Sequence, residues 1–188
     1  MKGNTKMALD YLESKIDGLR SEASSVRAAH SALRSSVQNN KSLSPQGMQE
    51  QIKESKARAD ARISELQAEE LRLISEKLES SQRVLFGSAI SSSDIIAERD
   101  AQDRADNIKT EAEALRLIER TVRSGDRSMT NAILRRALDA GWPNAIDEVG
   151  KSYPASAGVV RDISALNNTL NDIRHVLGRS MAYGSVID

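Results

Sequence analysis

LESKIDGLRSEASSVRAAHSALRSSV, residues 12–37, decides the fold expected of this chain. Within this stretch, apolar side chains recur at alternating steps of four and three residues, and His30 is the one polar member of the series. The positions are Leu12, Ile16, Leu19, Ala23, Val26, His30, Leu33 and Val37. This spacing places a narrow stripe along one side of an α-helix, as in a coiled-coil seam. Because such a helix gains most of its stability from a packed partner, the rest of the chain is expected to supply one.

A long antiparallel helical hairpin is expected over residues 5–86. Residues 39–44 break the helical pattern of the first helix. Ser44 and Pro45 then favour a new helix start, with Ser as the N-cap and Pro at the first helical position. So short a connection returns the second helix alongside the first.

A third long helix is expected to follow the hairpin. The second helix is predicted to carry an apolar line that shifts phase between Leu66 and Leu71, so that its two ends face different neighbours. Residues 87–93 are rich in Gly and Ser and indicate a flexible joint. The third helix is predicted over residues 94–124 and ends at Gly125, a residue typical of left-handed helix caps.

Two domains are predicted, with the boundary after residue 125. Residues 1–125 would form a three-helix, coiled-coil-like bundle, and residues 126–188 a small C-terminal helical subdomain that ends in one long amphipathic helix. The apolar positions of that last helix again alternate by four and three: Val159, Ile163, Leu166, Leu170, Ile173 and Leu177. The final stretch, residues 181–184, is expected to fray. The fold class is all-α.

Composition narrows the function classes. The chain of 188 residues has no cysteine, 3% aromatic residues, and 27 basic against 27 acidic side chains. Disulfides and cysteine chemistry are therefore excluded, and the balanced charge, spread over all segments, argues against a nucleic-acid partner. No signal peptide or apolar stretch long enough to span a membrane is found, so a soluble, cytoplasmic protein is expected.

Catalytic and metal-binding patterns are weak. His30 lies on the stripe of the first helix, where a hydrogen-bonded structural role is expected, and His175 is expected to face solvent in the last turns of a helix. The acidic run Glu65, Glu69 and Glu70 has no histidine at the spacing of a carboxylate metal site. No phosphate-binding or nucleophile motif occurs, so no enzyme activity, cofactor or metal is predicted.

Residues 133–149 have the outline of a helix–turn–helix. The second helix of that outline contains Asp147 and Glu148 and, up to residue 149, no basic residue, which would repel phosphate; ordinary helix packing is therefore the preferred interpretation. The residues singled out as a candidate partner interface are Arg135, Arg136, Trp142 and Tyr153.

The segment NAILRRALDAGWPNAI, residues 131–146, resembles small helical proteins encoded among the virion genes of tailed phages of actinobacteria. The resemblance covers roughly a third of the chain and includes Tyr153, Pro154 and the helix that follows. It implies an accessory of capsid or head–tail assembly, with capsid, portal or tail proteins as partners, possible retention in the virion, and no particular site residues.

A structural or assembly protein that acts through protein–protein contacts, in several copies, is the function expected. Two alternatives stay open. One is a nucleic-acid-associated coiled-coil protein, whose binding would weaken steeply with salt. The other is a cellular scaffold or adaptor built on the helical hairpin.

Overall fold

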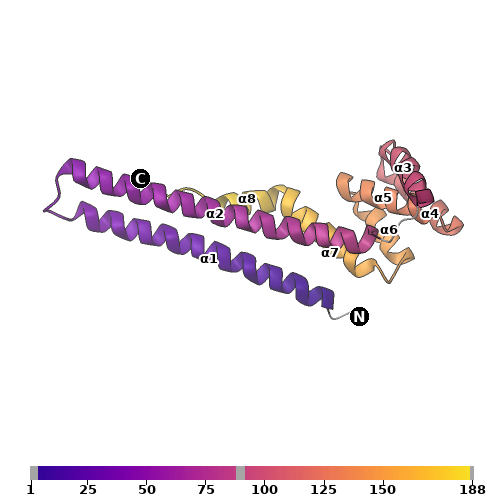
Figure 1. The fold of residues 1–188 in the computed structure, drawn as a ribbon, viewed down its shortest axis with the longest axis horizontal. Coiled ribbons are helices and arrows are strands. Elements are labelled where there is room, and N and C mark those ends of the chain that lie inside the picture. Colours follow the sequence, from indigo (N-terminus) through magenta and orange to yellow (C-terminus); the bar gives the residue numbers. More distant parts are fainter. Residues whose placement is uncertain (1–3, 88–91, 187–188) are drawn as a thin grey trace. The chain divides into compact units, whose positions relative to one another are not determined.

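The protein is all-α over the residues that the computed structural model describes, which are 4–87 and 92–186 for the backbone and 9–87 and 95–186 for the side chains. Within these ranges the chain forms eight helices and no strand, so the predicted fold class is confirmed (Figure 1). The helices are α1 (Asn4–Gln38), α2 (Pro45–Phe86), α3 (Ser92–Asp106), α4 (Glu111–Ser124), α5 (Arg127–Ala140), α6 (Pro143–Ser152), α7 (Ala157–Asn171) and α8 (Ile173–Ala182).

The described helices belong to two compact units. Residues 6–75 and 169–186 lie in one, which we call the hairpin unit, and residues 76–168 lie in the other, which we call the short-helix unit. This division runs elsewhere than the predicted boundary after residue 125, because α4 and α5, on either side of that residue, share one apolar core.

In the hairpin unit, the stripe of α1 is largely buried. The buried members are Leu12, Ile16, Ala23, His30 and Val37, and Leu19 and Val26 are half-buried. Leu33 departs from the prediction, because its side chain is exposed. The alternating spacing of apolar residues thus predicts the buried side of α1 at all but one position.

Contacts between α1 and residues 45–75 of α2 run in opposite order along the two helices. Glu22 on α1 pairs with Arg62 at 2.6 Å, whereas His30, further along α1, meets Ser55, nearer the start of α2. The two segments therefore lie antiparallel within this unit, as Figure 1 shows. We call this pair of segments the hairpin.

The start of α2 is capped as the sequence predicts. The hydroxyl oxygen of Ser44 accepts a hydrogen bond from the backbone N–H of Gly47 at 3.1 Å. This bond satisfies one of the backbone donors that the first turn of a helix leaves without a partner. Pro45 then occupies the first helical position, where its missing N–H has no effect.

The buried line of α2 passes through Glu70. Its buried members are Ser55, Ala59, Ile63, Leu66, Glu70, Ile74 and Ser81. The predicted phase shift from Leu66 to Leu71 is therefore wrong: the line keeps its direction, and the position between the two leucines is a carboxylate. Hydropathy alone misses such a position, because charged residues are almost never fully buried unless they are paired.

The predicted third helix is broken. Residues 107–110 separate α3 from α4, and the hydroxyl of Thr110 accepts a hydrogen bond from the backbone N–H of Glu113 at 3.3 Å. The sequence Thr-Glu-Ala-Glu at this point is a capping-box pattern, so a local signal for the helix start exists. The break also changes the buried face: Ala112 is exposed, whereas Ala114 and Ile118 are buried.

The core of the short-helix unit is formed by α3 to α7. Its buried members include Ala105, Ile108, Ile118, Ile133, Leu134, Ala145 and Ile163. Gly125 and Gly141 end α4 and α5 with φ of 73° and 68°, the left-handed conformation that glycine adopts without strain. Gly125 thus ends a helix as predicted. The predicted joint at residues 87–93 lies in part, over 88–91, outside the described residues.

The predicted long final helix is two helices. Asp172 separates α7 from α8 with φ −66° and ψ 132°, an extended conformation. Of the apolar ladder predicted for one helix, Ile163 and Leu166 are buried, whereas Ile173 and Leu177 are exposed. The local cause is the side chain of Asp172, which accepts a hydrogen bond from the backbone N–H of Arg174 and so caps α8.

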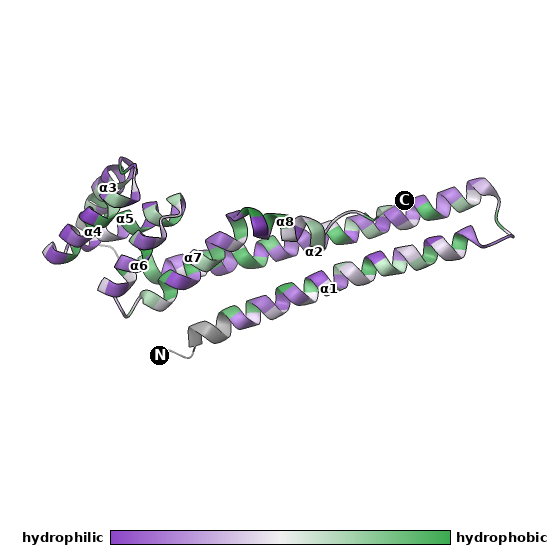
Figure 2. Cartoon of the chain, turned by 180° about the vertical axis from the view of Figure 1, so that it is seen from behind, coloured by the Kyte–Doolittle hydropathy of each residue, from purple (hydrophilic) through white to green (hydrophobic). Residues whose placement is uncertain are grey.

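Hydropathy along the ribbon alternates between apolar and polar in most helices (Figure 2). Among the residues that the structure describes, none of the helices combines the length and the apolar character that crossing a membrane requires.

Candidate functional site

A buried carboxylate, that of Glu70, organises the hairpin unit. Its side chain is 0% exposed. Arg20 of α1 donates two hydrogen bonds to it, from Nη2 to Oε1 at 2.8 Å and from Nε to Oε2 at 2.9 Å. Arg179 of α8 donates from Nε to Oε1 at 3.1 Å, and the hydroxyl of Tyr183 donates to Oε2 at 2.8 Å. Four donors from two distant parts of the chain therefore meet on one carboxylate.

The pKa values of this cluster follow from that geometry. Burial raises the pKa of Glu70, but hydrogen bonds from Arg20, Tyr183 and Arg179 outweigh burial and hold the pKa below its usual value. Burial, together with the nearby carboxylate, raises the pKa of the Tyr183 hydroxyl. At neutral pH the cluster therefore contains an ionised carboxylate, two guanidinium groups and a neutral phenol.

The C-terminal segment, residues 173–186, is held to the hairpin by further polar contacts. Arg27 donates to the backbone oxygen of Ala182 at 2.7 Å, and Lys56 donates to that of Val186 at 2.5 Å. The backbone N–H of Val186 donates to the carboxylate of Asp60 at 3.0 Å. In addition, a small apolar cluster joins the segment to the hairpin through Ala23, Ala59, Ile63, Leu66, Tyr183 and Val186.

These contacts overturn one prediction. The sequence predicts that residues 181–184 fray, but Tyr183 is buried and hydrogen-bonded to Glu70. The sequence contains a partial signal: Tyr183 is one of three tyrosines in a chain that has few aromatic residues. Nothing in the local pattern indicates its partner, because Glu70 lies more than a hundred residues away.

The outward face of α8 is apolar. Ile173, Leu177 and Met181 are 67%, 55% and 80% exposed. They recur at steps of four residues and therefore lie on one side of the helix. We call these three residues the α8 stripe. Figure 2 shows the apolar colouring of this helix. Most amphipathic helices turn their apolar face inward, whereas α8 turns Arg179 inward and leaves the stripe in solvent.

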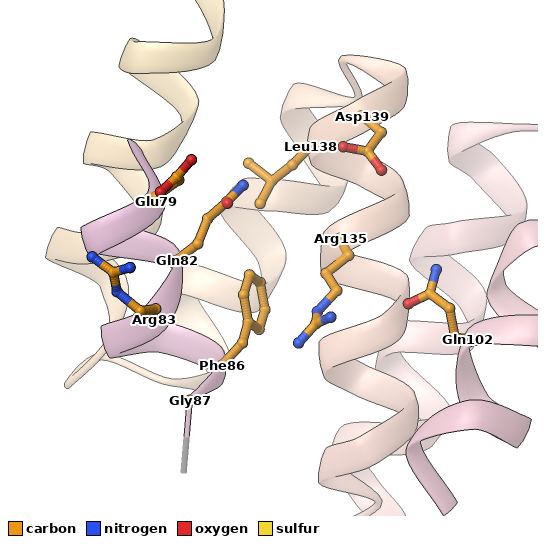
Figure 3. Close-up of a pocket in the computed structure, with 9 residues that line it drawn as sticks. All are labelled: Glu79, Gln82, Arg83, Phe86, Gly87, Gln102, Arg135, Leu138 and Asp139. Atoms are coloured by element: carbon orange, nitrogen blue, oxygen red, sulfur yellow. The ribbon is translucent and has the colours of Figure 1, made fainter. Parts of the chain in front are cut away.

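A separate open groove lies in the short-helix unit, with a volume of about 560 Å³. Figure 3 shows its lining, which comes from the end of α2, from α3 and from α5. Arg135 faces the ring of Phe86, with 4.4 Å between the guanidinium carbon and the ring centroid. Leu138 and Phe86 are apolar, and Glu79 and Asp139 balance the charges of two arginines. The groove thus has no dominant charge that would select a ligand.

The four residues predicted as a partner interface have different surroundings. Arg135 is exposed and lines the groove. Arg136 is half-buried; its Nε donates to the backbone oxygen of Ile108 at 3.2 Å, and its guanidinium lies over the ring of Trp142. Trp142 and Tyr153 both pack against the core of the short-helix unit. Three of the four residues therefore contribute to packing, whereas Arg135 is exposed and lies over the ring of Phe86.

His30 is buried on the α1 stripe as predicted, whereas His175, predicted to lie in the last turns of a helix, is found in the first turn of α8. His30 is buried and its Nδ1 lies 3.0 Å from the hydroxyl oxygen of Ser55, while its Nε2 has no partner. His175 is exposed. Of the acidic run, Glu65 and Glu69 form surface ion pairs with neighbouring arginines. In the part of the chain that the structure describes, no group of three histidines or carboxylates could hold a metal ion.

The residues that sequence analysis missed are Glu70, Arg179 and Tyr183. Glu70 and Arg179 are charged residues, which sequence patterns assign to the surface, and Tyr183 lies in the stretch that the sequence predicts to fray. Together they can hold the C-terminal segment in one orientation, and they leave the α8 stripe as the exposed feature of that segment. No protein family, curated protein sequence or solved structure matches the chain.

Proposed function

We propose that this chain is a non-enzymatic helical structural or assembly protein that acts by binding other proteins. The observation that carries the proposal is the α8 stripe. Three large apolar side chains stand exposed on a helix whose opposite face is already docked. Contiguous exposed apolar surface on a folded protein is typical of a protein interaction site.

Within that class, we propose a component of a phage virion, located in the capsid or at the head–tail junction. The support is the resemblance of residues 131–146 to small helical proteins of phage virion gene clusters. Capsid, portal and tail proteins are then the partners, and several copies of the chain would act together. The hairpin would set a spacing between partners, while the α8 stripe would provide the contact.

The test is binding to the structural proteins encoded beside the gene for this chain. Each is co-expressed with the wild type, with a variant carrying Leu177→Ser and Met181→Ser, and with a control variant carrying Val84→Ser. Val84 is also an exposed apolar residue, but it lies on α2. We expect one capsid, portal or tail protein to co-purify with the wild type and the control and to be lost from the double variant. Retention by the double variant, or binding to none of these proteins, would refute the proposal.

The alternative of a nucleic-acid-associated protein has one observation in its favour. Arg116, Arg120 and Arg123 recur at steps of four and three residues along α4, and all are exposed. However, Arg123 pairs with Glu119 at 2.6 Å, which reduces the charge available to phosphate. DNA binding that falls steeply with salt, and that Arg116→Gln with Arg120→Gln weakens, would favour this alternative over the first proposal.

A further inference from the structure

The apolar spacing over α7 and α8 predicts one continuous helix, whereas the structure contains two separate helices. The alternating ladder from Val159 to Leu177 is the pattern of one continuous helix. In the structure the helix is interrupted at Asp172, and the ladder is divided: Ile163 is buried, whereas Ile173 and Leu177 are exposed. A continuous helix would place Ile173 and Leu177 in line with the buried residues of α7.

The interruption depends on a single residue. Asp172 is the one non-helical residue between Asn171 and Ile173. Its carboxylate accepts hydrogen bonds from the backbone N–H of Arg174 at 2.8 Å and from the guanidinium of the same residue at 3.1 Å. An N-cap of this kind contributes modestly to helix stability. A small perturbation at Asp172 can therefore change the balance between the interrupted pair of helices and one continuous helix.

The docked position of α8 gains little from hydrophobic burial. Its large apolar residues stay in solvent, and the C-terminal segment buries mainly Tyr183 and Val186. What holds the segment is the set of polar contacts centred on Glu70. Such contacts are specific in geometry but do not distinguish one copy of the chain from another.

The docking site is complementary to the C-terminal segment of any copy. Glu70 receives Arg179 and Tyr183, while Arg27 and Lys56 bind backbone oxygens of the segment. A second copy carries the same donors in the same order. When two identical chains can exchange an identical element, the contacts are conserved, and only the hinge conformation changes.

We propose that residues 173–186 form an exchangeable segment. With Asp172 extended, the segment docks on its own hairpin; with α7 and α8 joined in one helix, it docks on the hairpin of a second copy. The partner is thus a second copy of this chain. The inference rests on the proposed role in protein–protein contact and names its first partner.

The test begins with Asp172→Ala in the full-length chain. Alanine removes the cap and favours the continuous helix. We expect the dimer dissociation constant, measured by light scattering over a concentration series, to fall about tenfold or more relative to the wild type. The matched control is Asp126→Ala, which removes the N-cap of α5 in the short-helix unit and should leave the dissociation constant unchanged.

Exchange is distinguished from simple stripe-to-stripe pairing by a second change. Adding Glu70→Gln to Asp172→Ala destroys the docking site in both chains, so the dimer should be lost. Adding Tyr183→Phe, which removes one hydrogen bond and keeps the ring, should weaken the dimer to a smaller extent. A dimer that survives Glu70→Gln but is lost with Leu177→Ser would overturn exchange and would still support the proposed function.

A covalent readout does not depend on how stable the Glu70 variant is. Because the chain has no cysteine, single cysteines can be introduced as Lys56→Cys in one Asp172→Ala preparation and Ser185→Cys in another. Refolding the two together and adding a short thiol cross-linker should yield an inter-chain product that joins the two variants. A folded, monomeric Asp172→Ala protein, or the absence of this product from its dimer, would refute the inference.

Discussion

Replacing Glu70 by glutamine tests whether the buried carboxylate of Glu70 stabilises the hairpin unit. Glutamine keeps the size of the side chain but removes the charge, so Arg179, which is buried, is left without its counter-ion. Removal of one member of a buried ion pair costs about 3–5 kcal/mol. Arg20 is partly exposed and can be rehydrated, so we expect the lower end, about 3 kcal/mol at pH 7. Urea unfolding followed by far-UV circular dichroism measures this loss.

The pH dependence separates the charge from the packing. The hydrogen bonds from the two arginines and Tyr183 lower the pKa of Glu70 in the folded chain, in spite of burial. A carboxyl group whose pKa is lower when folded contributes stability that is present above its unfolded pKa, about 4.3, and is lost as pH falls through the folded pKa. The difference between wild type and Glu70→Gln should therefore be complete at pH 7 and should decrease once the pH falls below about 4.

The matched control is Glu69→Gln. Glu69 is the adjacent residue, but its carboxylate pairs with Arg72 at the surface and remains in contact with water. Exposed ion pairs contribute little, so the unfolding midpoint should not change measurably. Equal effects of the two substitutions would refute the argument that burial of the Glu70 cluster, rather than helix charge, is what stabilises the hairpin unit.

Three further predictions concern the short-helix unit. Burial raises the pKa of Asp162, against the attraction of Lys77 and Arg161, so its charge reduces stability as the pH rises through the folded pKa. Asp162→Asn should therefore stabilise the chain against urea at pH 7, and the gain should vanish in acid. Glu111 accepts hydrogen bonds from Asn144 that lower the pKa of the Glu111 carboxyl group and fix the start of α6. Glu111→Ala should therefore lower the midpoint temperature of thermal unfolding. This effect should disappear when the pH is below the pKa of the carboxyl group. Gly141→Ala forces a side chain into the left-handed conformation and should cost about 1–2 kcal/mol in urea unfolding.

Helix ends that rest on local chemistry could be predicted from the sequence. Ser44 starts a helix and Gly125 ends one where expected, because capping depends on residues within one turn. The breaks at Thr110 and Asp172 have the same local chemistry, an oxygen side chain that accepts from a nearby backbone N–H. Apolar spacing alone does not reveal them, because it continues across both breaks.

The candidate site could not be predicted in this way. Glu70 lies on the buried line of α2, but a carboxylate at such a position is only stable when donors reach it. Those donors, Arg20, Arg179 and Tyr183, come from fifty and more than a hundred residues away in the sequence. Periodicity describes one helix at a time, and this site exists only when three helical segments meet.

The same reasoning suggests why a carboxylate occupies the seam. An aliphatic residue at position 70 would give an apolar surface to which the Ile173 and Leu177 face of α8 could dock, and that face would then be buried. Glu70, with Arg20 beside it, instead accepts the face that carries Arg179, because only that face supplies donors. A buried ion pair contributes little net stability compared with an apolar contact, but it can select one orientation among several. Glu70 therefore determines which side of α8 is free, and so determines that the apolar stripe remains available to another protein.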